Sequence, residues 1–158
     1  MKTIDVGIIG GGLIAQVEHL PNLLNLPGLF RFRGIADPSP TVRKHLETRF
    51  GVKTFATAEA LLAEPLEAVV IAAPDSYHAD LSVAALERGL HVFCEKPLCY
   101  RPEDADRVAA ARDKAGRVLQ VGYMKRYDPS YEELRRTLDV SEVTFARITT
   151  LEDRKSVV

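Results

Sequence analysis

The regular alternation of short apolar runs with longer helix-like segments is the feature that most constrains this chain. Apolar residues dominate four of the short runs, Thr3–Ile9, Phe30–Ala36, Ala68–Ala72 and Leu90–Cys94. A nearly continuous apolar run is typical of a parallel strand that is buried on both faces. Strands separated by helices favour right-handed crossovers within one sheet. We therefore predict an α/β fold with a doubly wound, mostly parallel sheet and helices on both faces.

Helix start and stop signals lie between these strands. Ser39 suits an N-cap and Gly51 suits a C-terminal cap, which predicts a helix over Ser39–Phe50. Pro21 lies inside the helix-like segment Leu13–Leu26, and because proline lacks an amide donor we expect a break or a new start there. Further helices are expected at Thr57–Ala63, Ser76–Arg88, Arg101–Ala115 and Pro129–Leu138, and further strands at Val52–Phe55 and Arg117–Val121.

The pattern changes after residue 138. Residues 1–138 follow the doubly wound alternation and are expected to form one dinucleotide-binding domain. Within residues 139–158, the run Glu142–Leu151 alternates like a strand, and no crossover helix follows it. We expect residues 139–158 to be the first strand of a truncated second domain. Since an unpaired strand edge favours association, we also expect a homo-oligomer through Glu142–Leu151.

Composition excludes several classes of protein. The 158 residues are 46% apolar and 27% charged with a net charge of −1, which suits a compact domain and favours neither nucleic acid nor a membrane. Cys94 and Cys99 make neither a disulfide framework nor a zinc pattern, and they indicate reduced thiols in a cytoplasmic protein. His19, His45 and His91 are expected to be structural or surface groups, with no metal-ligand spacing.

A glycine-rich turn follows the first strand. Gly10, Gly12 and Ala15 form the pattern G-x-G-x-x-A at the start of a helix-like segment. The first glycine permits a tight turn, the second leaves room for a pyrophosphate, and the alanine allows close packing of helix on strand. Amides at a helix N-terminus attract an anion. The pattern predicts dinucleotide binding, and the alternative is a tight turn without a ligand.

Asp37 ends the second strand, where an acidic side chain accepts hydrogen bonds from the hydroxyls of an adenosine ribose and repels a 2′-phosphate. The acidic side chain therefore favours NAD over NADP. Arg43 leaves NADP as the less favoured alternative, because its cation could still reach a 2′-phosphate. The alternative for Asp37 is an Asx-turn or a capping role before Ser39.

Small and polar residues also follow the fourth strand, at Ala73, Pro74, Asp75 and His78. The carboxyl ends of the strands are where open α/β sheets bind their ligands. We expect these residues to face the cofactor; for His78 the alternative is local packing or hydrogen bonding.

Lys96 follows the next strand and is the residue we expect to carry chemistry. Partial desolvation of a lysine in a cleft makes its amine a usable proton donor or acceptor. Glu95 either opposes that change or holds the lysine in place, and the alternative is an exposed ion pair in a loop. Two further cations, Lys125 and Arg126, follow the strand expected at Arg117–Val121 and suit either an anionic or polyhydroxylated ligand or a solvated surface.

Taken in order, these motifs resemble the glucose–fructose oxidoreductase, inositol dehydrogenase and rhizopine catabolism (Gfo/Idh/MocA) family. The resemblance rests on Gly10 to Ala15, Ala36-Asp37, Ala73 to His78, Glu95-Lys96-Pro97 and Val121 to Pro129. It implies a Rossmann domain that binds NAD or NADP, with Leu13, Ile14 and Glu95 among the cofactor contacts. It also implies a catalytic Lys96 at a substrate hydroxyl, a Lys96-Pro97 bond that is cis, and substrate contacts from Tyr123 and Arg126.

Two positions depart from the family pattern, in which asparagine often replaces Asp75 and arginine is common at Lys125. Family members continue into a second α/β domain that supplies most of the substrate pocket. The resemblance therefore implies a dehydrogenase of a cyclitol, sugar or related polyol, shortened to its nucleotide-binding half. The alternatives are a dinucleotide-binding module without turnover and a methyltransferase that uses the glycine turn for S-adenosylmethionine.

Overall fold

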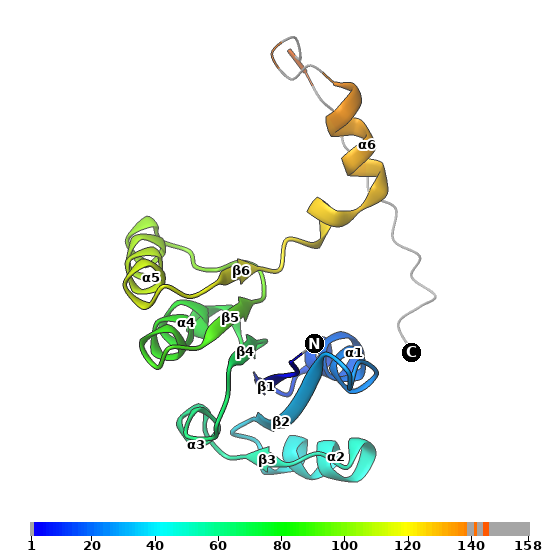
Figure 1. Cartoon of the computed structure of the whole chain (residues 1–158), viewed down its shortest axis with the longest axis vertical. Coiled ribbons are helices and arrows are strands. Elements are labelled where there is room, and N and C mark those ends of the chain that lie inside the picture. Colours follow the sequence, from blue (N-terminus) through cyan, green and yellow to red (C-terminus); the bar gives the residue numbers. More distant parts are fainter. Residues whose placement is uncertain (1, 139–140, 142–143, 146–158) are drawn as a thin grey trace. The chain divides into compact units, whose positions relative to one another are not determined.

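The computed structural model describes residues 2–138, 141 and 144–145, and the chain divides into two compact units, Met1–Tyr123 and Met124–Val158 (Figure 1). The expected strand at Glu142–Leu151, and the association proposed through it, lie outside the described residues. The domain boundary expected at residue 138 stays a prediction.

A six-stranded parallel sheet forms the centre of the first unit, in the order β3-β2-β1-β4-β5-β6. The strands are β1 (Ile4–Ile9), β2 (Phe30–Ala36), β3 (Thr54–Phe55), β4 (Ala68–Ile71), β5 (His91–Cys94) and β6 (Leu119–Val121). The chain runs outward from β1 in one direction through β2 and β3, and then in the other direction through β4 to β6. This reversal makes the carboxyl ends of β1 and β4 the place where such a sheet binds ligands.

Helices cover both faces of the sheet, as the sequence predicts (Figure 1). The helices of this unit are α1 (Leu20–Leu24), α2 (Pro40–Phe50), α3 (Ala58–Leu62), α4 (His78–Glu87) and α5 (Pro102–Ala115). Helices α1 and α2 pack on one face, where Leu20 and Leu46 meet Ile8 and Ile35. Helices α3 to α5 pack on the other. The predicted doubly wound α/β fold is confirmed.

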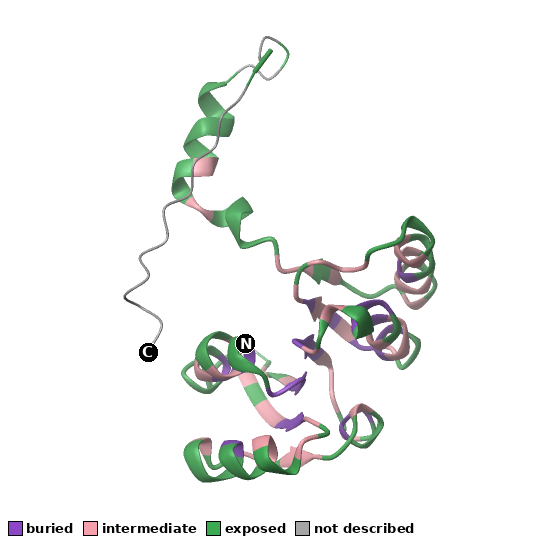
Figure 2. Ribbon diagram, turned by 180° about the vertical axis from the view of Figure 1, so that it is seen from behind, coloured by how far each residue is buried: buried purple, intermediate pink, exposed green. Residues whose placement is uncertain are grey.

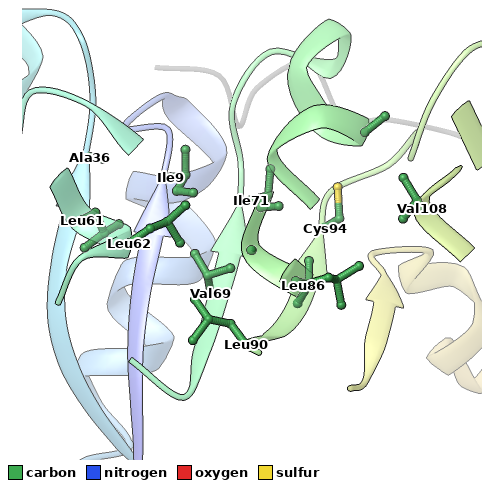
Figure 3. Packing of buried hydrophobic residues seen from close by; sticks show 13 residues of the cluster. Ile9, Ala36, Leu61, Leu62, Val69, Ile71, Leu86, Leu90, Cys94 and Val108 are labelled. Carbon is green, nitrogen blue, oxygen red and sulfur yellow. The ribbon is translucent and has the colours of Figure 1, made fainter. Parts of the chain in front are cut away.

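Strand residues alternate between these two cores because side chains along a strand point to opposite faces. In β4, Val70 packs with α1 and α2, whereas Val69 and Ile71 pack with Leu86 of α4 on the other face (Figure 3). Figure 2 shows that the buried residues gather in the strands and on the inward sides of the helices. Burial on both faces explains why the β4 sequence is almost continuously apolar.

The break expected at Pro21 takes the form of a one-turn π-helix, Ala15–His19, that leads directly into α1. The Leu20 amide donates to the carbonyl oxygen of Ala15, five residues earlier. Proline has no amide hydrogen and its ring collides with the carbonyl one turn before it in an α-helix. The wider turn before Pro21 accommodates both properties without ending the helix.

The two cysteines are free thiols with different exposure: Cys94 is buried in β5 and Cys99 is half-buried. Burial raises the pKa of the Cys94 thiol to about 11. Because the thiolate is the reacting form, we expect Cys94 to resist a thiol reagent such as dithionitrobenzoate at pH 8 while Cys99 reacts. Titration before and after denaturation checks this, with Cys94→Ser identifying the slow thiol. Rapid reaction of both thiols in the folded protein would contradict the burial.

The second unit contains a 3-10 turn, Met124–Tyr127, followed by α6 (Pro129–Thr137). The Asp128 carboxylate caps α6 by accepting from the Ser130 amide at 3.0 Å, and Pro129 takes the first helical position. In neither unit does the described part of the chain include a helix long and apolar enough to cross a membrane.

Candidate functional site

The turn after β1 is locked in place at Gly10. Its φ is +98°, in the region that favours glycine, and its amide donates to the Ala36 carbonyl at 2.8 Å. A Cβ at this position would lie 2.5 Å from backbone atoms of Ala72 and Ala73. The turn therefore passes directly against the end of β4, and no side chain fits between them.

Gly12 lies at an open position in the same turn. A Cβ built there would meet no atom within 4 Å, and Leu13 beside it is 75% exposed. Ala15, one turn further on, is completely buried against the sheet. The start of the helix is thus packed on one side and accessible on the other, which fits the approach of a pyrophosphate to backbone amides.

Asp37 joins the end of β2 to the glycine turn. Its Oδ2 accepts from the Gly11 amide and its Oδ1 accepts from the Ser39 amide, both at 2.8 Å. The Asx-turn that the sequence left as an alternative is therefore present. A carboxylate has about four acceptor positions, so these two bonds leave capacity for ribose hydroxyls. Arg43 donates to the backbone carbonyl oxygens of Asp37 and Pro38, at 2.8 and 2.9 Å, which holds its guanidinium at the start of α2.

The loop after β4 is tied to the loop after β5 by two polar contacts. In the first, the Tyr100 hydroxyl donates to the Asp75 carboxylate and holds the pKa of Asp75 below its ordinary value. The sequence analysis did not predict a role for Tyr100. The available signal was Asp75 itself: the family often has asparagine at this position, and a carboxylate there needs a donor such as the Tyr100 hydroxyl.

The second contact is made by His78, which is 2% exposed. Its Nδ1 lies 2.7 Å from the Pro97 carbonyl oxygen and its Nε2 lies 2.8 Å from that of Ala73. A neutral imidazole carries one N–H, so donation to both carbonyls requires the imidazolium form. His78 thus makes the local hydrogen bonds of the alternative reading, and its contact with a cofactor stays a prediction.

Lys96 is exposed at the end of β5, after Glu95 and before a cis bond to Pro97. The cis bond that the resemblance implies is confirmed. Among the residues that the structure describes, none forms a hydrogen bond or ion pair with Lys96 Nζ. The exposed ion pair with Glu95 that the sequence left open is absent from this part of the chain, because the Glu95 carboxylate has other partners.

One of those partners, His19, was expected to be only a structural or surface group. Its Nε2 lies 2.8 Å from Glu95 Oε1, and the two side chains are 16% and 18% exposed. The signal available in the sequence was spacing: His19 follows Ala15 by four residues, so both lie on the same side of a helix.

Tyr123, the last residue of the first unit, is 51% exposed. Arg126 belongs to the second unit, where it lines a shallow hollow with Tyr131 and Arg135. Its neighbour Lys125 pairs with Asp128 at 3.1 Å. The substrate roles of Tyr123 and Arg126 stay predictions.

Three features together define an NAD-binding Rossmann domain: an open glycine turn after β1, an acidic side chain at the end of β2, and a parallel sheet whose strand order reverses between β1 and β4. Residues 4–123 match the family described as "Oxidoreductase family, NAD-binding Rossmann fold", GFO_IDH_MocA. The chain therefore belongs to the Gfo/Idh/MocA family, as its motifs suggest.

Similar proteins agree with this placement. Inositol 2-dehydrogenase 4 of Saccharopolyspora erythraea is 49% identical over 142 residues, which are 87% of this chain and 41% of that protein. The scyllo-inositol dehydrogenase of Lactobacillus casei was solved with NAD(H) and scyllo-inositol. It has a TM-score of 0.78 and 25% sequence identity, and the match covers 85% of this chain and 40% of that dehydrogenase. KijD10, a 3-ketoreductase from Actinomadura kijaniata, was solved with NADP. It has a TM-score of 0.79 and 32% sequence identity, and the match covers 87% of this chain and 42% of the KijD10 chain. The chain spans about 40% of the length of the curated relatives it matches.

Proposed function

We propose that this chain is the nucleotide-binding half of an NAD-dependent dehydrogenase that acts on a CH–OH group of a cyclitol, sugar or related polyol. The observation that carries the proposal is the accessible glycine turn at Gly12, next to the Asp37 carboxylate at the carboxyl edge of the sheet. The relatives named as inositol dehydrogenases support the substrate class.

In this proposal, each part of a dinucleotide would lie against residues that the structure describes. The amides after Gly12 would face the pyrophosphate, and Leu13 and Ile14 would border it. Asp37 would accept hydrogen bonds from the adenosine ribose. The loop Ala73–Asp75 and Glu95 lie at the carboxyl ends of β4 and β5, where the nicotinamide end would reach. When bound, NAD supplies the hydride acceptor.

Lys96 would act on the substrate hydroxyl. Its amine takes the hydroxyl proton or, as an ammonium, stabilises the oxygen on which negative charge develops. The lack of a described partner for Lys96 Nζ leaves the amine available for this role. Tyr123 and Arg126 would add contacts to the polyol.

The test is a titration with NADH and NADPH read by nicotinamide fluorescence, which suits a chain without tryptophan. We expect saturable binding, with NADH tighter than NADPH. S-adenosylmethionine should not displace NADH, and displacement would favour the methyltransferase alternative. Absence of binding by either dinucleotide would contradict the proposed site.

A second candidate function is dinucleotide binding without turnover. In that case the residues at the glycine turn and Asp37 hold the cofactor, and no substrate is held in position for catalysis. An assay with myo-inositol and NAD⁺ separates the two candidates. Formation of NADH that requires both Lys96 and substrate supports the dehydrogenase, whereas binding without NADH formation supports the module.

Asp37 also predicts a change in cofactor preference. We expect Asp37→Asn to raise the ratio of NADPH to NADH affinity about fivefold, the effect of removing a partly exposed charge interaction of ~1 kcal/mol. Asparagine keeps one side-chain oxygen for the backbone amides. Fluorescence titrations with both cofactors measure the ratio, and Asp106→Asn on α5 is the matched control. An unchanged ratio would mean that Asp37 does not face the 2′ position.

A further inference from the structure

Glu95 and Lys96 are adjacent in the sequence and carry opposite charges, yet their side chains do not pair. The Glu95 carboxylate uses Oε1 to accept from His19 Nε2 at 2.8 Å and Oε2 to accept from the Lys96 backbone amide at 3.2 Å. Because a carboxylate only accepts, the hydrogen between His19 and Glu95 belongs to Nε2. The contact therefore sets the tautomer or charge of His19 as well as the direction of Glu95.

The surroundings hold the carboxylate in this direction. The His19 ring meets Phe93 edge-on, with ring centres 5.5 Å apart at 66°. A Cβ on Gly122 would lie 3.2 Å from the Phe93 ring and 3.4 Å from Glu95 Oε1, so this side is already close-packed. Glu95 thus lies between a histidine, an aromatic ring and a backbone, and away from the lysine ammonium.

His19 reaches Glu95 from the π-helix Ala15–His19. Ala15 is completely buried and His19 lies at the edge of the same packed side, beside β5. Single π-turns inside helices are frequent at functional sites. Here the turn belongs to the same segment that begins at the glycine turn, so the segment contacts both the dinucleotide side of the site and the lysine loop.

We propose that His19 is a positioning residue that holds the Glu95 carboxylate away from the Lys96 ammonium and so keeps the lysine amine available to a substrate hydroxyl. This inference rests on the proposed function of Lys96. Its physical basis is simple: a carboxylate beside an ammonium stabilises the charged form and occupies its donors. Without His19, Glu95 is free to turn toward Lys96.

The experiment measures how fast the Lys96 amine reacts with a trace of acetic anhydride at fixed pH, since only an uncharged, unpaired amine is acylated. Peptide mass spectrometry gives the rate relative to Lys114, an exposed lysine on α5 that serves as an internal standard. We expect His19→Phe, which keeps a ring against Phe93, to slow Lys96 acylation about two- to fivefold, the range of an exposed ion pair. An unchanged rate in folded His19→Phe would overturn the proposal.

Further variants separate positioning from structural damage. Adding Glu95→Gln to His19→Phe should restore the rate of Lys96 acylation. The side chain at position 95 can then still turn toward Lys96, but it no longer carries a charge that stabilises the ammonium. His19→Gln, whose amide can still donate to Glu95, should keep the rate close to that of the unmodified chain. His45→Gln on α2 is the matched histidine control and should have no effect.

Glu95→Gln alone tests the proposal without relying on the folding of any His19 variant. If Glu95 is held away from Lys96, this substitution leaves Lys96 acylation unchanged; a several-fold increase would show that the two side chains already pair and would refute the inference. No cofactor is present in these measurements. Failure here is therefore distinguishable from failure of NADH binding, which would count against the proposed function itself.

Discussion

Gly10→Ala is expected to lower the free energy of unfolding by about 3–5 kcal/mol, a large part of the stability of a domain of this size. Two costs combine. The backbone has a φ of +98°, which strains any residue with a side chain, and the new methyl group would lie 2.5 Å from backbone atoms at the end of β4. Relief requires β1 and β4 to move apart. Urea unfolding followed by circular dichroism measures the change.

Gly51→Ala is the matched control for this prediction. Gly51 ends α2 with a φ of +65°, but a Cβ there would meet no atom within 4 Å. Its substitution should therefore cost only the left-handed conformation, about 1 kcal/mol. Equal losses for Gly10→Ala and Gly51→Ala would show that close approach to β4 is not what requires a glycine at position 10.

Gly12→Val is expected to leave the fold intact and to weaken NADH binding about 10- to 100-fold. The position is open in the structure, because a Cβ there would meet no atom within 4 Å, and we therefore expect the valine side chain to be accommodated. It would occupy the space through which a pyrophosphate approaches the helix amides. Losing one hydrogen bond to a charged group costs about 1.5–3 kcal/mol, which corresponds to this range. Fluorescence titration gives the affinity, and urea unfolding gives the stability.

Gly12→Val is informative because Gly10→Ala lies two residues away with the opposite expected outcome. Gly10→Ala should lose stability before its affinity can be interpreted, whereas Gly12→Val should lose affinity at nearly constant stability. Gly28→Val, at another glycine with open space around it, is the control for added apolar volume. Retention of NADH affinity in Gly12→Val would place the pyrophosphate elsewhere on the domain.

Most of the fold follows from local patterns in the sequence. The helix α2 is the clearest case: Ser39 accepts from the Val42 amide, and Gly51 takes the left-handed conformation that a C-terminal cap requires. The buried strands were equally evident, because β4 is apolar on both faces. Capping and periodicity act within a few residues, so a single segment contains the information that determines them.

Parts of the candidate site were also predictable, because position along a strand predicts position in the sheet. Gly10, Asp37 and Lys96 each follow a predicted strand, and parallel strands bring their carboxyl ends to one edge. The structure places these residues at the ends of β1, β2 and β5 as expected. Their roles toward a cofactor or substrate remain predictions that the titrations address.

What the sequence by itself determined is therefore the sheet, its helices and the edge at which the chemistry-bearing residues lie. Only the tertiary structure decided their partners. His19 meets Glu95 across 76 positions in the sequence, and Tyr100 meets Asp75 across 25. Periodicity reports which side of an element is buried, but it carries no information about which side chain lies opposite. That choice depends on how helix and strand pack, and it directs Glu95 to a histidine and leaves Lys96 without a described partner.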